Sequence, residues 1–117
     1  MFPLHELRCE GCRNGDPSLS DADILNLHRQ VPNWDVKRKD GFNCLERVFT
    51  FRSFPYAVDF VVQAGKIAHE ENHHPLIMIE YDTVTITLWT HKVRGLHIND
   101  FIMAAKIDVL NKSYSAG

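Results

Sequence analysis

The chain has 117 residues, of which 44% are apolar and 24% are charged, and its formal net charge at pH 7 is −2. This length predicts one domain, residues 1–117, and the slightly acidic charge disfavours general binding to nucleic acids or anionic membranes. The sequence shows no secretory signal and no apolar run of the roughly 18 residues that a membrane span needs, and its three cysteines form no disulfide scaffold, so we expect a cytoplasmic protein.

Hydrophobic periodicity and turn residues predict three helices and four strands. Ser20 is a good N-cap and Pro32 ends the first helix, while Gly41 supplies the unusual φ of a hairpin turn. The expected elements are, in chain order, a helix over Leu19–Val31, strands over Trp34–Arg38 and Phe42–Phe51, a helix from Phe54 to about Asn72, strands over Leu76–Tyr81 and Val84–His91 around a turn at Asp82-Thr83, and a final helix after Gly95 that starts at Asn99 or Asp100.

This order indicates an α+β fold in which a four-stranded antiparallel sheet carries helices on one face. The other face of the sheet, with Trp89, should be partly open. Two helices are expected to bury one apolar stripe each, made of Phe54, Ala57, Val58, Val61, Gly65 and Ala68 in the long helix and of Phe101, Ile102, Ala105 and Val109 in the last. The polar ends, residues 1–17 and 113–117, lack periodicity and are expected to be flexible.

Three histidines and a carboxylate fall at the ends of these elements. His73 and His74 precede Pro75 at a helix-to-strand junction, His91 ends a strand, and Asp100 lies at the start of the last helix. Because imidazole has both protonation states near neutral pH, a pair of histidines can act as acid and base in one turnover. Asp100 can orient an imidazole or balance its charge.

Other interpretations of these residues stay open. A histidine at a strand end is often only a satisfied polar residue, and three imidazoles can also bind zinc. The cluster lacks the H-x-H and H-x-x-x-H spacings that place two ligands on one face. Cys9-x-x-Cys12 is compatible with a zinc or redox site, but no second cysteine pair follows, which favours the interpretation of this stretch as a mobile, polar N-terminal segment.

The stretch His69-Glu-Glu-Asn-His73-His74-Pro75, followed by Tyr81, Thr90-His91, Gly95-Leu96 and Asp100, resembles the pterin-4a-carbinolamine dehydratases. The resemblance covers nearly the whole chain after about Cys9. It implies a lyase without a cofactor or metal that converts 4a-hydroxytetrahydrobiopterin to quinonoid dihydropterin and water. It implies catalytic roles for His73, His74, His91 and Asp100, and we expect the substrate-binding residues to be His69, Glu70, Pro75, Trp89 and Thr90.

The chemistry fits these residue types. Loss of hydroxide from C4a needs a proton donor, and the new double bond needs removal of the N5 proton, so two groups that titrate near pH 7 serve both steps. We hypothesise that His73 and His91 do this acid and base work, while His74 binds or orients the substrate. The sequence departs from the family at His69, where a Glu is common, and at Ile77, where some animal members have Trp.

The resemblance also implies partners. Family members form homodimers or homotetramers, and some animal members bind a transcription factor. An alternative function is therefore a non-catalytic binding, assembly or transcriptional-dimerisation module on the same fold, with no direct contact to nucleic acid. The retained His73, His74, His91 and Asp100 favour the enzyme.

Overall fold

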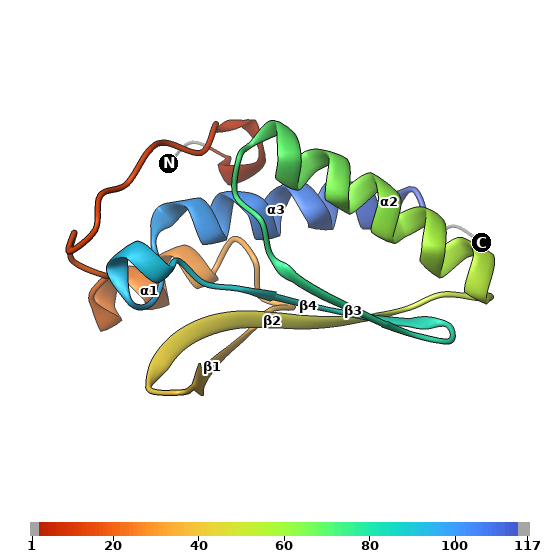
Figure 1. Ribbon diagram of the computed structural model, residues 1–117, viewed down its shortest axis with the longest axis horizontal. Coiled ribbons are helices and arrows are strands. Elements are labelled where there is room, and N and C mark those ends of the chain that lie inside the picture. The colour runs from red at the N-terminus through yellow and green to blue at the C-terminus, as the bar shows by residue number, and fades with distance from the viewer. Residues whose placement is uncertain (1–2, 115–117) are drawn as a thin grey trace.

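A computed structural model describes residues 3–114 of the chain. Within these residues the elements are η1 (Leu4–Glu6), α1 (Asp21–His28), β1 (Asp35–Lys39), β2 (Phe42–Thr50), α2 (Phe54–Glu70), β3 (Leu76–Glu80), β4 (Thr83–Leu88), η2 (His91–Val93) and α3 (Ile98–Lys112), where η marks a short 3-10 helix (Figure 1). The predicted order of helices and strands is confirmed. No helix in this part of the chain is both long and apolar enough to cross a membrane.

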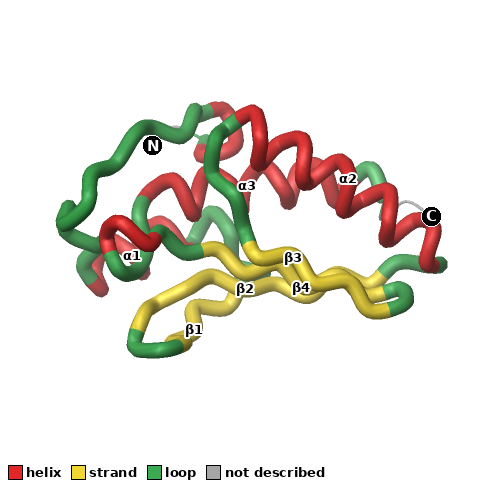
Figure 2. The backbone as a smooth tube through the Cα atoms, in the orientation of Figure 1, coloured by secondary structure: helices red, strands yellow, loops and turns green. Residues whose placement is uncertain are grey.

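The four strands form one antiparallel sheet in the order β1-β2-β4-β3. Helices α2 and α3 lie over one face of this sheet, and the opposite face carries no helix of residues 3–114 (Figure 2). The predicted α+β fold, with helices packed on one face, is therefore confirmed. Both hairpins turn through residues with positive φ, at Asp40-Gly41 as predicted and at Tyr81, one residue before the predicted turn.

The core lies between the sheet and the two long helices. The last strand, β4, contributes Val84, Ile86 and Leu88, which alternate along it and are fully buried. Phe60 of α2 is the centre of an aromatic group, with its ring centroid 4.9 Å from that of Phe49 and 4.8 Å from that of Phe51. Such tilted pairs add to the stability that burial provides, because ring edges carry positive and ring faces negative partial charge.

The buried stripes of the helices differ from those predicted. In α2, Phe54 and Val58 are 48% and 38% exposed, and Phe60 and Ala64 are buried instead. Because α2 is apolar on more than one side, several sets of positions satisfy the 3.6-residue period, and periodicity alone does not single out the buried set. In α3, Phe101, Ile102 and Ala105 are buried as expected, but Val109 is 46% exposed.

Several element ends also differ from those predicted. Helix α1 is shorter at both ends. The Ser20 side chain accepts a hydrogen bond from the Asp23 backbone N–H and so caps a helix that begins at Asp21, and the helix ends at His28, before a turn at Arg29 and Gln30. Strand β4 ends at Leu88, so His91 does not end a strand but opens the 3-10 helix η2. Helix α3 begins at Ile98, one residue before the predicted start.

The polar N-terminal segment makes contacts that the sequence did not predict. Leu4 is only 2% exposed, and η1 packs against α3. At the other end, Tyr114 packs edge-on against Phe51 and Phe60 and donates a hydrogen bond to Asp59 over 2.6 Å. These contacts attach parts of both terminal segments to the core. The expectation for residues 1–2 and 115–117 lies outside the described residues.

Candidate active site

The end of α2 places His73 and His74. Asn72 adopts a left-handed φ of 52°, and the backbone N–H of His73 donates to the Ala68 carbonyl over 3.0 Å. Asparagine tolerates this conformation well, so the helix closes tightly here. Pro75 then holds the chain in the extended conformation that leads into β3.

Asp100 lies directly behind His73. Nε2 of His73 donates to Oδ1 of Asp100 over 2.6 Å, and the Asp100 carboxylate has no solvent exposure. Its other oxygen, Oδ2, accepts from the Thr90 hydroxyl over 2.8 Å and from the His97 backbone N–H over 3.0 Å. Three donors therefore satisfy this buried carboxylate, and because it accepts from Nε2, the Nδ1 atom of a neutral His73 is left as an acceptor.

Asp100 lies in the first turn of α3, and the cap of this helix holds its side chain in place. His97 is the N-cap: its Nδ1 accepts from the Asn99 backbone N–H over 3.1 Å, and Asp100 completes the capping box. An acidic side chain in the first turn of a helix is also favoured by the helix dipole. The same residue thus caps the helix and holds His73.

His91 reaches the site from the segment after β4. Its Nε2 accepts a hydrogen bond from the Trp89 indole N–H over 3.1 Å, and the two ring centroids are 5.2 Å apart. A neutral His91 therefore carries its proton on Nδ1. The segment is folded back by Arg94, which has a left-handed φ of 56°, and by the bridge between Thr90 and Gly95.

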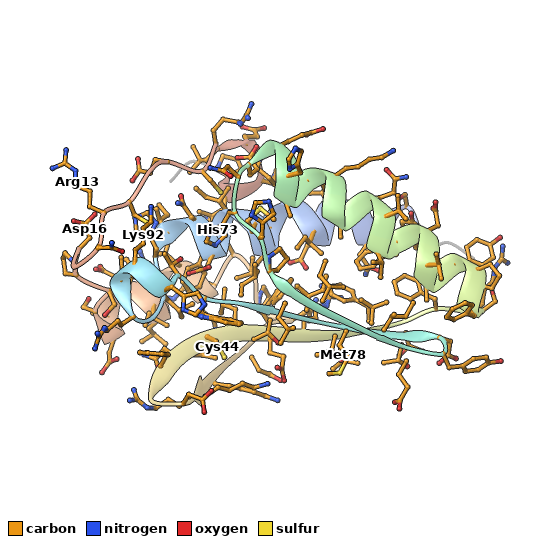
Figure 3. The ribbon with its side chains drawn as sticks, in the orientation of Figure 1. Arg13, Asp16, Cys44, His73, Met78 and Lys92 are labelled. Carbon is orange, nitrogen blue, oxygen red and sulfur yellow. The ribbon has the colours of Figure 1, made fainter. Side chains whose placement is uncertain are left out.

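His73, His74 and His91 line a cavity of about 370 Å³, which lies within the size range of small-molecule sites. Four stretches of chain line it: Cys9–Cys12, Glu71–His74, Trp89–Lys92 and Asn99. In Figure 3, His73 and Lys92 lie in the same half of the molecule as Arg13 and Asp16 of the N-terminal segment. The cavity is thus built from both ends of the sequence.

The structure brings most of the predicted site residues together. His73, His74, His91, Trp89 and Thr90 line the cavity, and Asp100 is in contact with His73 behind its wall. The other three predicted substrate-binding residues do not line it. His69 is exposed, with its ring 6.1 Å from that of His74, Glu70 is exposed at the end of α2, and Pro75 is half-buried after the histidines.

Sequence reasoning missed the contribution of the N-terminal segment and of Glu71, Asn72, Lys92 and Asn99 to the cavity. The one available signal was Cys9-x-x-Cys12.

Burial and the nearby Glu71 carboxylate raise the pKa of the Cys9 thiol to about 12. Cys9 therefore stays protonated at neutral pH, which is unsuited to a nucleophile. Over residues 3–114, His, Cys, Asp and Glu side chains form no group of three that could hold a metal ion.

Comparison with known proteins identifies the family of this chain. The family model described as pterin 4 alpha carbinolamine dehydratase matches residues 17–110. The chain belongs to this family. A relative from Nitrosococcus oceani, which carries the provisional name pterin-4-alpha-carbinolamine dehydratase, is 48% identical over 112 residues, covering 96% of this chain and 99% of its own.

A solved structure has a similar fold. It is the crystal structure of a transcriptional coactivator/pterin dehydratase from Brucella melitensis, which is 30% identical to this chain with a TM-score of 0.72. The match covers 80% of this chain and 97% of the Brucella chain. Residues 3–16, which supply part of the cavity wall, precede the match to the family model.

Proposed function

We propose that this protein is a pterin-4a-carbinolamine dehydratase that removes water from 4a-hydroxytetrahydrobiopterin to give quinonoid dihydropterin, in the recycling of tetrahydrobiopterin. The observation that carries the proposal is the His73–Asp100 pair, with its 2.6 Å contact, on a cavity that His74 and His91 also line. Membership of the family names the reaction, and the imidazoles supply the proton transfers that it needs.

The proposed step balances without a redox partner. The C4a–O bond breaks as the hydroxyl group takes a proton from one imidazolium and leaves as water. A second imidazole takes the proton from N5, and the electron pair of the N5–H bond forms the C4a=N5 double bond. His73 and His91 carry these two roles, and the Asp100 carboxylate balances the positive charge of His73 whenever that ring holds the extra proton.

His74 has a different role in this mechanism. It lines the cavity beside His73, but among residues 3–114 no hydrogen bond or ion pair fixes its ring. An imidazole free to turn is suited to contact the substrate rather than to hold a fixed proton. We therefore assign it to binding and orienting the pterin.

Single replacement of the histidines tests these roles. We expect His73→Ala and His91→Ala to lower kcat by about 10²–10⁴-fold, the usual contribution of a general acid or base, and His74→Ala to act mainly on KM. His5→Ala is a matched control, because His5 is exposed and lies outside the cavity lining. Losses below about tenfold for all three variants, measured by the absorbance change on dehydration, would contradict the assignment.

A second candidate is a binding module. The Brucella relative favours it, because that protein is described as a transcriptional coactivator as well as a pterin dehydratase. The two functions predict different outcomes in the same assay. A chain that only docks a partner accelerates dehydration no more than a buffer blank, and its histidine variants keep full binding to that partner.

We further propose that the protein is cytoplasmic and forms a homodimer or homotetramer. Cys9, Cys12 and Cys44 are free thiols, which fits a reducing compartment. Strand β3 is an edge strand, and β3 and α2 expose apolar side chains, including Met78 at 57% and Val62 at 49%. Such surfaces are typical of contacts between copies of a chain. Sedimentation as a monomer at micromolar concentration would contradict the assembly.

A further inference from the structure

The N-terminal segment is fixed at the cavity by two buried polar side chains. Oε1 of Glu71 accepts from the Cys9 backbone N–H over 2.7 Å, and Oε2 of the same carboxylate pairs with Arg8 over 2.8 Å. The Asn99 side chain accepts from the Glu10 N–H over 2.9 Å and donates to the Glu10 carbonyl over 2.6 Å. The backbone of Glu10 is therefore held on both sides, like a residue paired in a sheet.

Among the described residues, the Glu10 carboxylate is the one at the site that is left for a ligand. Both oxygens of Glu71 are occupied by Cys9 and Arg8, and Asp100 is occupied by His73, Thr90 and the His97 N–H. In residues 3–114 the bonds that involve Glu10 use its backbone, and its exposed side chain has no partner. Glu10 also lines the cavity beside the histidine-bearing segments.

The chemistry of a pterin complements such a carboxylate. The 2-amino-4-oxopyrimidine ring presents the N3–H and one N–H of the 2-amino group side by side, so one carboxylate accepts both bonds in the fork arrangement that makes charge-assisted pairs strong. Lys92 and the histidines of the cavity wall offer the donors and acceptors that the carbonyl, the hydroxyl and the ring nitrogens of such a substrate require.

We propose that Glu10 is a substrate-binding residue whose carboxylate accepts hydrogen bonds from the 2-amino and N3–H edge of the pterin, with Asn99 as the residue that positions it. This inference rests on the proposed dehydratase function. It explains why the polar segment before residue 17 is fixed at the cavity, although it precedes the family match. The alignment with the Nitrosococcus relative covers 96% of the chain and includes this segment.

The test compares Glu10→Gln with a matched control, Glu6→Gln, which alters an exposed carboxylate of the same segment outside the cavity. Loss of one charge-assisted bond is expected to raise KM about ten- to a hundred-fold in Glu10→Gln and to leave kcat within about threefold, because the histidines are unchanged. Glu6→Gln should match the wild type in both constants.

Calorimetric titration with two stable ring compounds gives a second readout. The wild type should bind pterin more tightly than lumazine, which has an oxygen acceptor in place of the 2-amino donor group. Glu10→Gln should lose most of this preference, because an amide can donate as well as accept. A purely structural role for the segment would weaken both ligands equally.

The outcomes separate this inference from the function on which it rests. A wild type that dehydrates the substrate, together with a Glu10→Gln variant that keeps the wild-type KM and the preference for pterin, would overturn the role of Glu10 alone. A wild type that neither accelerates dehydration nor binds pterin would overturn both proposals. A raised KM with a lost preference supports both.

Discussion

Asp100 is the most constrained residue of the candidate site. It is fully buried, satisfied by His73, Thr90 and the His97 N–H, and it also caps α3. A buried carboxylate in such a network has little freedom to move, so it fixes the ring plane of His73 and the atom that carries its proton. Positioning of this kind affects chemistry more than binding.

Asp100→Asn tests this role with little change in volume. An amide in place of the carboxylate cannot accept from His73 while it also accepts from Thr90 and His97, and it balances no positive charge. We expect kcat to fall at least about tenfold, with a smaller change in KM. Asp59→Asn is the matched control, since Asp59 accepts from Tyr114 far from the cavity lining. Equal kcat values for the two variants would contradict the assignment.

At the scale of elements, one carboxylate links side chains of three strands. All five residues of the edge strand β1 are exposed, and its backbone pairs with β2. Glu46 of β2 adds side-chain bonds to this pairing, because Lys37 and Lys39 of β1 donate to Glu46 over 2.8 Å and 2.5 Å, and Thr87 of β4 donates over 2.8 Å. Hydrogen bonds from Lys37, then from Lys39, lower the pKa of Glu46 from 4.5 to about 2.

This shift predicts how stability depends on pH. Because the pKa is lower in the folded state, the ionised form stabilises the fold fully above about pH 4.5, and this stabilisation is lost as the pH falls toward 2. We expect Glu46→Gln to lower the free energy of unfolding by about 1 kcal/mol at pH 7, and the difference from wild type to shrink as the pH falls through this range. Urea denaturation measures the free energy of unfolding of the variant and of the wild type at each pH.

Glu80→Gln is the control for this series, because Glu80 is an exposed residue of the opposite edge strand, β3. Glu80→Gln should leave the free energy of unfolding within about 0.5 kcal/mol of wild type from pH 7 to pH 2. A constant gap between Glu46→Gln and wild type from pH 7 to pH 2 would show that the Lys pairs do not act through the charge of Glu46.

At the scale of the whole molecule, local patterns in the sequence predicted the elements and the residues that meet at their ends. The sequence placed His73, His74, His91 and Asp100 at turns and caps, which Pro75 and Gly95 mark. These local features bring the four residues together in the fold. The contact between His73 and Asp100 joins residues 27 positions apart. The end of one helix and the start of another, both visible in the sequence, place the two partners of this contact once the fold is known.

The part of the site that the sequence did not reveal depends on long-range contacts without periodicity. Glu10 is held by Asn99 across 89 positions, and nothing in a polar segment with no apolar repeat indicates where it will pack. The predicted strand that ended at His91 failed for a related reason. The Thr90–Gly95 bridge and the left-handed Arg94 turn the chain back after Leu88, and β-propensity alone does not reveal that turn.

The central claim is that this fold, with the His73–Asp100 pair at its cavity, dehydrates a 4a-hydroxytetrahydropterin. The most direct test is to generate that compound in place and to follow its ultraviolet absorbance at several enzyme concentrations, with His74→Ala beside the wild type. The reaction also proceeds slowly alone, so a blank sets the reference. We predict a rate above the blank that rises in proportion to wild-type enzyme and is weakened in the variant. A wild-type rate equal to the blank at every concentration would contradict the account.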